Sequence, residues 1–361
     1  MKPTDESDSR GVAASWLGGA ELVEERRARL LAHPAVRAWR ELGPDRLDPV
    51  RVLPGRKHRA SLQSLPLYRL EGVGDEGRPV IAKWCSAEGG RAERVMYEDV
   101  LPEIPLDAPR YYGSVDDASG GFWLFLHFVE GEKYLRLDPL HRALAARWLA
   151  LLHTSPVSAA VRARLPDEGP ARRLVNLREA RDRILRNRAN LALDADEVGF
   201  LERLVARLDE LEGIWGRLEE ACKGLPPAIV HGDFKGKNLR IRSGRDGPAL
   251  VAFDWGESAF GVPAVDLAQS SVPASALCAL PDLETYESVV RSRNPQVERG
   301  TIQRVAQCGT IFRAVTAIHW AACGLETEWP AVAIEEMRLV DADLVNILRG
   351  REGTLPISRA I

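Results

Sequence analysis

The sequence predicts an α+β protein of two lobes, a small antiparallel β lobe with one helix followed by a larger, mostly helical lobe. Between residues 50 and 130, short segments rich in β-forming residues alternate with turn signals. Beyond residue 131, long segments carry the 3.6-residue spacing of amphipathic helices. A length of 361 residues is ample for two such lobes. We therefore expect a cleft near residue 130, where the pattern changes.

These changes of pattern divide the chain into four segments. Residues 1–49 are expected to form an N-terminal helical extension, in which a charged helix covers residues 21–42 and ends at the helix-breaking run GPDRLDP. Residues 50–130 are expected to form the small lobe, residues 131–350 the large lobe, and residues 351–361 a C-terminal tail.

The small lobe is expected to contain five strands and one helix. The strands share an enrichment in β-branched and aromatic residues, and turn-rich segments such as Gly72–Gly77 separate them. They are RVLP (51–54), LPLYRLEGV (65–73), PVIAKW (79–84), RYYGSV (110–115) and GFWLFLHFV (121–129). Residues 89–101 are expected to form the helix, because Val95, Val100 and Leu101 lie near one helical face.

The large lobe is expected to be helical, with an island of short strands. The periodic segments predict helices over residues 140–153, 171–189 and 197–222, and again through most of 266–350. The strand candidates between them are PPAIVHGD (226–233), NLRIR (238–242) and ALVAFDW (249–255). This order places the strand island in the middle of the lobe.

Composition and charge exclude several classes of partner and site. A formal charge of −3 gives no field that would attract nucleic acid or an anionic membrane surface. The five cysteines are scattered and lack CxxC spacing, so we expect neither a disulfide framework nor a zinc site. The apolar stretch 314–325 is too short to span a bilayer, and the N-terminus lacks a signal pattern. We expect a cytoplasmic protein, whose oligomeric state the sequence does not indicate.

The strongest chemical signal is IVHGDFKGKN at residues 229–238, followed by VAFDWG at residues 251–256. Phosphoryl transfer needs a carboxylate beside the attacking hydroxyl, and oxygen ligands that hold Mg²⁺ against the phosphates. A loop between two strands can present an aspartate and, five positions later, an asparagine to one site. An aspartate that ends the next hairpin strand can reach the same metal. Asp233, Asn238 and Asp254 have this arrangement.

HGDxxxxN followed by a strand ending in Asp-Trp-Gly resembles the aminoglycoside phosphotransferase and choline kinase superfamily, whose members are relatives of protein kinases. The resemblance implies a bilobal protein-kinase-like fold and ATP- and Mg²⁺-dependent transfer to a hydroxyl of a small molecule. It implies Asp233 as catalytic base, Asn238 and Asp254 as magnesium ligands, and a structural role for His231. The alternative is a chance turn with Asp254 as a capping or surface carboxylate, which the flanking apolar strands in register disfavour.

Two lysines of the same loop are interpreted differently. Lys235 stands two positions after Asp233, where protein kinases of the serine/threonine type often have a lysine near the transferred phosphate. A cation there would offset charge on the equatorial oxygens. A solvated loop lysine is an equally good interpretation of Lys235. We interpret Lys237 as solvated.

The phosphate anchor is expected upstream, on the third strand of the small lobe. Pro79–Trp84 resembles the Val-Ala-Ile-Lys strand of kinases, with Lys83 pairing the α- and β-phosphates of the nucleotide. The alternative is a lysine that only extends its charge from a strand to water. By the same resemblance, Glu93 of the following helix would hold Lys83, and Glu98 is the rival.

Leu124–Gly131 resembles the hinge where the family binds adenine through backbone groups, here the carbonyl of His127 and the amide of Val129. Upstream, the loop at residues 53–61 contains one glycine, where a glycine-rich phosphate loop is expected. Its basic residues Arg56, Lys57 and Arg59 either cover the phosphates or are solvated. This departure leaves the choice between ATP and GTP open.

Two further segments have structural interpretations. Residues 260–268 resemble the family's Gly-x-Pro-x-x-Asp-Leu-Ala. Asp266 could cap the following helix, and the resemblance implies that it also supports the catalytic loop. Residues 144–153 resemble the helix that packs behind that loop and ends in Leu-His, so we expect His153 to be structural.

The acceptor is the least determined part of the prediction. Family members phosphorylate aminoglycosides, macrolides, peptide antibiotics, choline, homoserine and sugars. Glu257, Asp282 and Glu284 would suit a cationic acceptor, although charged residues of helical segments are more often solvated.

Two other functions remain as alternatives. A protein kinase is disfavoured, because only about ten residues separate Asp-Trp-Gly from Asp266 and leave little room for a peptide-docking segment. A pseudokinase that binds nucleotide as an interaction module would have lost one of the four residues Lys83, Asp233, Asn238 and Asp254, all of which are present.

Overall fold

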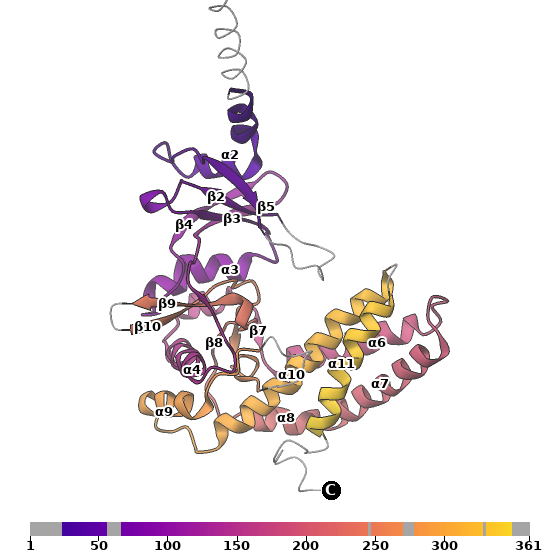
Figure 1. The fold of residues 1–361 in the computed structure, drawn as a ribbon. Coiled ribbons are helices and arrows are strands. Elements are labelled where there is room, and N and C mark those ends of the chain that lie inside the picture. The colour runs from indigo at the N-terminus through magenta and orange to yellow at the C-terminus, as the bar shows by residue number, and fades with distance from the viewer. Residues whose placement is uncertain (1–23, 56–65, 245–246, 270–277, 328–329, 349–361) are drawn as a thin grey trace, which may run out of the picture. The chain divides into compact units, whose positions relative to one another are not determined.

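The computed structural model has a mixed α+β architecture, drawn in Figure 1. It describes residues 24–55, 66–244, 247–269, 278–327 and 330–348. Within these ranges, no helix combines the length and the apolar character that crossing a lipid bilayer requires.

The chain divides into two compact units. The first contains Met1–Gly90 and Pro109–Val129, and the second contains Arg91–Ala108 and Glu130–Ile361. The boundary at Val129 falls within the segment expected to be the hinge. Residues 91–108 were expected in the small lobe, whereas they belong to the helical unit.

The first unit contains one sheet of five antiparallel strands in the order β1-β2-β3-β5-β4. The strands are β1 (Arg51–Pro54), β2 (Leu67–Glu71), β3 (Val80–Ser86), β4 (Tyr111–Asp117) and β5 (Gly121–His127). All five expected strands are therefore present. In the central strand β3, Lys83 lies opposite Leu67 on one side and Leu124 on the other.

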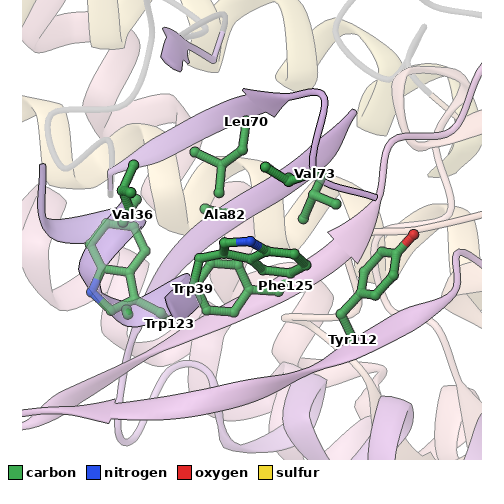
Figure 2. Packing of buried hydrophobic residues seen from close by; sticks show 11 residues of the cluster. Val36, Trp39, Leu70, Val73, Ala82, Tyr112, Trp123 and Phe125 are labelled. Carbon is green, nitrogen blue, oxygen red and sulfur yellow. The ribbon is translucent and has the colours of Figure 1, made fainter. Parts of the chain in front are cut away.

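Helix α2 (Pro34–Glu41) packs against this sheet. The ring centroid of Trp39, on this helix, lies 5.6 Å from that of Tyr112 and 5.4 Å from that of Phe125. Figure 2 shows the three rings. The single helix expected over residues 21–42 is broken, because helix 24–32 ends before His33. The His33 Nδ1 accepts a hydrogen bond from the amide of Ala35 at 3.3 Å and caps α2.

The second unit begins with residues 91–108, where α3 (Arg91–Val95) continues into the turns Met96–Val100 and Leu101–Glu103. This path follows the helix expected over residues 89–101. Polar contacts join the segment to the rest of the unit. Asp99 pairs with Arg164 at 2.6 Å, and Asp107 with Arg242 at 3.1 Å. Both contacts lie within the helical unit.

Eight further helices are described in the second unit. They are α4 (Pro139–Thr154), α5 (Ala159–Arg162), α6 (Pro170–Asn187), α7 (Ala195–Gly213), α8 (Trp215–Cys222), α9 (Leu283–Arg293), α10 (Thr301–Cys323) and α11 (Pro330–Leu348). The helix expected over residues 197–222 is divided at Ile214 into α7 and α8. Helix α10 is mostly buried, and it lies beside α6 and α11 (Figure 1).

Two small sheets make up the strand island, in the orders β10-β9-β6 and β7-β11-β8. Their strands are β6 (Glu132–Lys133), β7 (Asp167–Glu168), β8 (Ala228–Val230), β9 (Leu239–Gly244), β10 (Gly247–Ala252) and β11 (Ala259–Gly261). Strands β8, β9 and β10 were expected from the sequence. The other three contain two or three residues each, which is too short for a periodic pattern.

Candidate active site

The segment that links β8 to β9 carries the central residues of the candidate site. The fully buried strand β8 leads into residues 231–235, and one turn of 3₁₀ helix (Gly236–Asn238) precedes β9. Gly232 has φ +77°. A Cβ at this position would lie 2.1 Å from the carbonyl oxygen of Glu257, so the loop requires glycine here.

Asp233 is surrounded by groups that bind its carboxylate. The Asn238 Nδ2 donates hydrogen bonds to the backbone oxygen and to Oδ2 of Asp233, each at 3.0 Å. The Lys235 Nζ lies 2.5 Å from Oδ1, and the Lys237 Nζ lies 3.3 Å from Oδ2. The structure thus brings together Asp233, Asn238 and Lys235, and it also places Lys237 on the carboxylate rather than only in solvent.

These charges decide the protonation state of Asp233. Burial by itself would raise the pKa of the carboxyl, but Lys235, Arg313 and Lys237 together hold this pKa well below its ordinary value. Burial, assisted by Arg313, lowers the pKa of Lys235. At neutral pH, Asp233 is therefore an ionised carboxylate, which is the form that can accept a proton.

Asn238 and Asp254, the two expected magnesium ligands, lie at the base of the β9–β10 hairpin. Leu239 pairs with Ala252 in the ladder, and the amide of Phe253 donates to the carbonyl of Asn238 at 3.1 Å. This register fixes Asp254 close in space to Asn238. Asp254 has φ +68°, a left-handed conformation that costs a non-glycine residue free energy and is found preferentially at functional sites.

This donor set fits a magnesium ion. Mg²⁺ takes one or two carboxylates with phosphate and water oxygens. The Asp254 carboxylate and the Asn238 amide oxygen are ligands of this kind. Because the Asn238 Nδ2 is engaged by Asp233, the amide orientation turns Oδ1 away from that carboxylate.

Asp266 supports the loop that follows β8, as expected. Its Oδ2 accepts from the amide of His231 at 2.7 Å and its Oδ1 from the amide of Gly232 at 3.0 Å. The Nε2 of His153 lies 3.3 Å from Oδ2, and the Nδ1 of His153 lies 2.8 Å from the hydroxyl of Tyr286. The interpretation of Asp266 and His153 as structural supports is confirmed.

His231 lies in an aromatic layer under the loop. Its ring is 4.5 Å from that of Trp255 and 5.6 Å from that of Phe234, on which Trp148 stacks. Complete burial lowers the pKa of His231, so the ring is neutral at neutral pH. These surroundings agree with the structural role expected for His231.

Glu93 of α3 is buried within the second unit. A Cβ at Gly256 would lie 3.9 Å from its Oε2, so Glu93 lies beside the Asp-Trp-Gly turn. The rival residue Glu98 is partly exposed and pairs with Arg94 at 3.1 Å. Lys83 belongs to β3 of the first unit. Its pairing with Glu93 would join the two units and stays a prediction.

The residues expected to bind adenine end the last strand of the first unit. The amide of His127 donates to the carbonyl of Arg110 at 2.8 Å, and the amide of Phe128 donates to the carbonyl of Pro79 at 3.0 Å. The first unit ends two residues after His127, at Val129. Adenine binding by His127 and Val129 stays a prediction. Arg56, Lys57 and Arg59 of the expected phosphate loop lie outside the described residues.

Two of the acidic acceptor candidates already have structural partners. Asp282 caps α9 by accepting from the amide of Thr285 at 2.8 Å. Glu257 lies 3.7 Å from Arg172. Glu284 lies in the first turn of α9. These surroundings give the cationic acceptor no added support.

Arg313 was not expected at the site, but its Nη1 lies 3.8 Å from Oδ1 of Asp233. The sequence feature that could have indicated Arg313 is its place within the largely apolar helix α10, between the buried residues Phe312 and Ala314. A charged side chain in such a place is rare unless it is paired. Its partners, however, lie far away in sequence and could not be named from it.

Comparisons with known proteins bear on the whole arrangement. A model of a family described as phosphotransferase enzymes matches residues 89–300. Among curated protein sequences, none matches the chain.

Several solved structures share the fold of this chain. The GDP and kanamycin complex of APH(2″)-IIIa has 18% identity over 86% of this chain and 98% of its own, with a TM-score of 0.56. Plasmodium vivax ethanolamine kinase has 15% identity over 99% and 97%, with a TM-score of 0.57. A spectinomycin phosphotransferase in complex with ADP and spectinomycin has 11% identity over 85% and 94%, with a TM-score of 0.56. The expected protein-kinase-like fold is confirmed.

Proposed function

This chain belongs to the phosphotransferase enzyme family, and we propose that it is an ATP- and Mg²⁺-dependent kinase that phosphorylates a hydroxyl group of a small molecule. The observation that carries the proposal is the Asp233 carboxylate, which contacts the Asn238 amide and Lys235 on a loop that Asp266 supports. Two of the similar structures hold a nucleotide together with a small molecule, GDP with kanamycin in one and ADP with spectinomycin in the other.

Asp233 is the catalytic base in this proposal. The acceptor hydroxyl oxygen attacks the γ-phosphorus of ATP, and a new oxygen–phosphorus bond forms. The bond from that phosphorus to the oxygen bridging it to the β-phosphate breaks, and ADP leaves with the electron pair. The hydroxyl proton passes to the Asp233 carboxylate, which is ionised before the transfer because its pKa is lowered.

Lys235 stabilises the transferred group. Its ammonium lies 2.5 Å from Asp233 Oδ1, so a short movement of this flexible side chain takes it from the carboxylate to an equatorial phosphoryl oxygen. A cation there offsets charge that develops in the transition state. Lys235 therefore belongs to the catalytic group together with Asp233.

Asn238 and Asp254 would hold the magnesium ion, which neutralises phosphate charge when it is bound. The hydrogen bond from the amide of Phe253 to the carbonyl of Asn238 keeps the two ligand-bearing segments in register. On the nucleotide side, Lys83 would contact the α- and β-phosphates and Glu93 would orient Lys83. The backbone groups of His127 and Val129 would bind adenine.

The test is transfer of labelled γ-phosphate to pooled antibiotics, amino alcohols and sugars, with wild type and Asp233→Asn compared. We expect the wild type to label at least one acceptor and Asp233→Asn to lose about 100- to 10,000-fold in kcat, because the base is removed. Nucleotide affinity should stay within about threefold, a loss of under about 0.7 kcal/mol. Asp341→Asn is the matched control. Asp341 belongs to α11 and pairs with Arg207 of α7 at 2.5 Å, so it takes no part in the loop around Asp233.

Two outcomes would contradict the proposal. Undiminished transfer by Asp233→Asn would remove the base from the mechanism. Tight nucleotide binding by the wild type without transfer to any acceptor of the panel would favour a nucleotide-binding module instead.

A further inference from the structure

We infer that Arg313 of α10 is a positioning residue for the catalytic base, which it holds in place from beneath while Lys235 moves to the transferred phosphate. The inference rests on the proposed function, since it assigns Arg313 a role toward Asp233 as base. It concerns a residue on a helix outside the catalytic loop and outside the magnesium-binding hairpin.

Helix α10 approaches the support of the loop unusually closely. A Cβ at Gly309 would lie 1.8 Å from the carbonyl oxygen of Ala264, so only glycine permits this approach. In the next position of the helix, the Oγ1 of Thr310 accepts from the amide of Gln269 at 3.0 Å. The helix therefore fixes the position of residues 264–269, the segment that contains Asp266.

Arg313 follows Gly309 by four residues, so it lies on the same helix face one turn later. Its Nε donates to the carbonyl of Val265 at 3.0 Å, and its Nη1 lies 3.8 Å from Oδ1 of Asp233. Only 10% of its side chain is exposed. The planar guanidinium makes both contacts at once, which a flexible ammonium cannot do with the same geometry.

These contacts connect Arg313 to the catalytic loop at two points. One is direct, through the Asp233 carboxylate. The other passes through the Val265 carbonyl to the neighbouring Asp266, whose carboxylate binds the amides of His231 and Gly232. Movement of α10 relative to the loop is thus opposed at both ends of residues 231–233.

Burial distinguishes Arg313 from the other two cations around Asp233. Lys235 and Lys237 belong to the loop itself and their side chains are 26% and 38% exposed. Lys235 leaves the carboxylate in the proposed reaction. Arg313 comes from a buried helix and keeps its contact with the Val265 carbonyl. It therefore remains as the fixed positive group that keeps Asp233 aimed at the acceptor hydroxyl.

The test compares Arg313→Gln, Arg313→Lys and the control Arg207→Gln in steady-state kinetics with an acceptor found by the γ-phosphate screen. Arg207 is also a largely buried arginine, paired with Asp341 between α7 and α11. We expect Arg313→Gln to lower kcat about 10- to 100-fold, because small misplacement of a catalytic group has effects of this size. KM for ATP should change less than about threefold. Arg207→Gln should keep its kcat.

Arg313→Lys keeps the charge and the fold but reaches only one of the two partners, so its kcat should lie between those of Arg313→Gln and wild type. This variant decides the matter if Arg313→Gln does not fold. Wild-type kcat in Arg313→Lys, or a fall in Arg313→Gln no larger than that in Arg207→Gln, would overturn the inference. Asp233→Asn in the same assay separates the two proposals, since its full activity would refute the base and leave Arg313 without a role.

Discussion

The buried carboxylate of Asp266 supports the loop that contains Asp233. Burial by itself would raise the pKa of this carboxyl, but the hydrogen bond and charge of His153, with the charge of Arg313, hold the pKa below its ordinary value. The group is therefore ionised at neutral pH and binds the amides of His231 and Gly232 in its charged form. Such charge-assisted hydrogen bonds are stronger than neutral ones.

Replacing Asp266 by Asn should lower the free energy of unfolding by about 1–3 kcal/mol at pH 7, because the amide supplies one acceptor in place of two. A depressed folded pKa stabilises the fold above the unfolded pKa, and this stabilisation is lost as pH falls through the folded pKa. The difference between wild type and variant should hence shrink below about pH 4. Urea denaturation of wild type and variant at pH 7 and at a pH below about 4 measures this difference. A constant difference would contradict the assignment of charge to Asp266.

Single residues also show how far the sequence could define the candidate site. The spacing of Asp233 and Asn238 in one loop predicts their proximity, and the hairpin predicts that of Asp254. These partners are local, so a pattern in the sequence can show them. Arg313 comes from a distant helix, and its contact with Asp233 depends on the close packing allowed by Gly309. No periodicity in α10 encodes that contact.

Helices were predictable where the hydrophobic spacing continued over many residues, but the residues at which they begin and end were not. Helices α4 and α6 lie close to the expected ranges. The helix expected over residues 197–222 is divided at Ile214. The sequence pattern does not show this break, because the apolar spacing continues through it. The N-terminal helix is likewise broken at His33, where Pro34 starts α2 without needing an amide donor.

Helix α2 offers a test at the scale of an element. Trp39 is fully buried, and its indole nitrogen donates to the carbonyl of Leu47 at 3.0 Å. We expect Trp39→Ala to lower the free energy of unfolding by about 3–5 kcal/mol, because it leaves a cavity between α2 and the sheet. Denaturant titration of the full chain measures this.

Trp320→Ala is the matched control for Trp39→Ala, since the side chain of Trp320 on α10 is 61% exposed. It should change stability by no more than about 0.5 kcal/mol. Equal effects of the two substitutions would mean that α2 is not packed as Figure 2 shows.

At the scale of the whole molecule, the proposed residues are divided between the two units. Lys83, His127 and Val129 belong to the first, whereas Asp233, Asn238 and Asp254 belong to the second. The sequence pattern changes from strands to helices near residue 130, and the first unit ends at Val129. Residues 91–108 belong to the second unit, where Asp99 pairs with Arg164, a contact that no sequence pattern predicts.

This division makes nucleotide-dependent stabilisation a test of the proposal. A ligand that binds only the folded state stabilises by RT ln(1 + [L]/Kd), about 2.7 kcal/mol at a hundredfold excess over Kd. A non-hydrolysable ATP analogue with Mg²⁺ should therefore raise the unfolding temperature of wild type and of Asp233→Asn. Lys83→Ala should lose most of that rise, because it removes the proposed contact with the phosphates. Differential scanning fluorimetry over a range of analogue concentrations measures the shifts.

Lys223→Ala is the control for Lys83→Ala, because Lys223 is an exposed lysine at the end of α8 that pairs with Glu220 at 2.5 Å. This variant should keep the full rise. If Lys83→Ala also kept it, the lysine would not contact the nucleotide and the phosphate anchor would have to be sought elsewhere in the first unit. If neither wild type nor Asp233→Asn were stabilised, while both remained folded, binding of ATP itself would be refuted. Loss of the rise in Lys83→Ala alone would link a residue of the first unit to the phosphate chemistry proposed for the second.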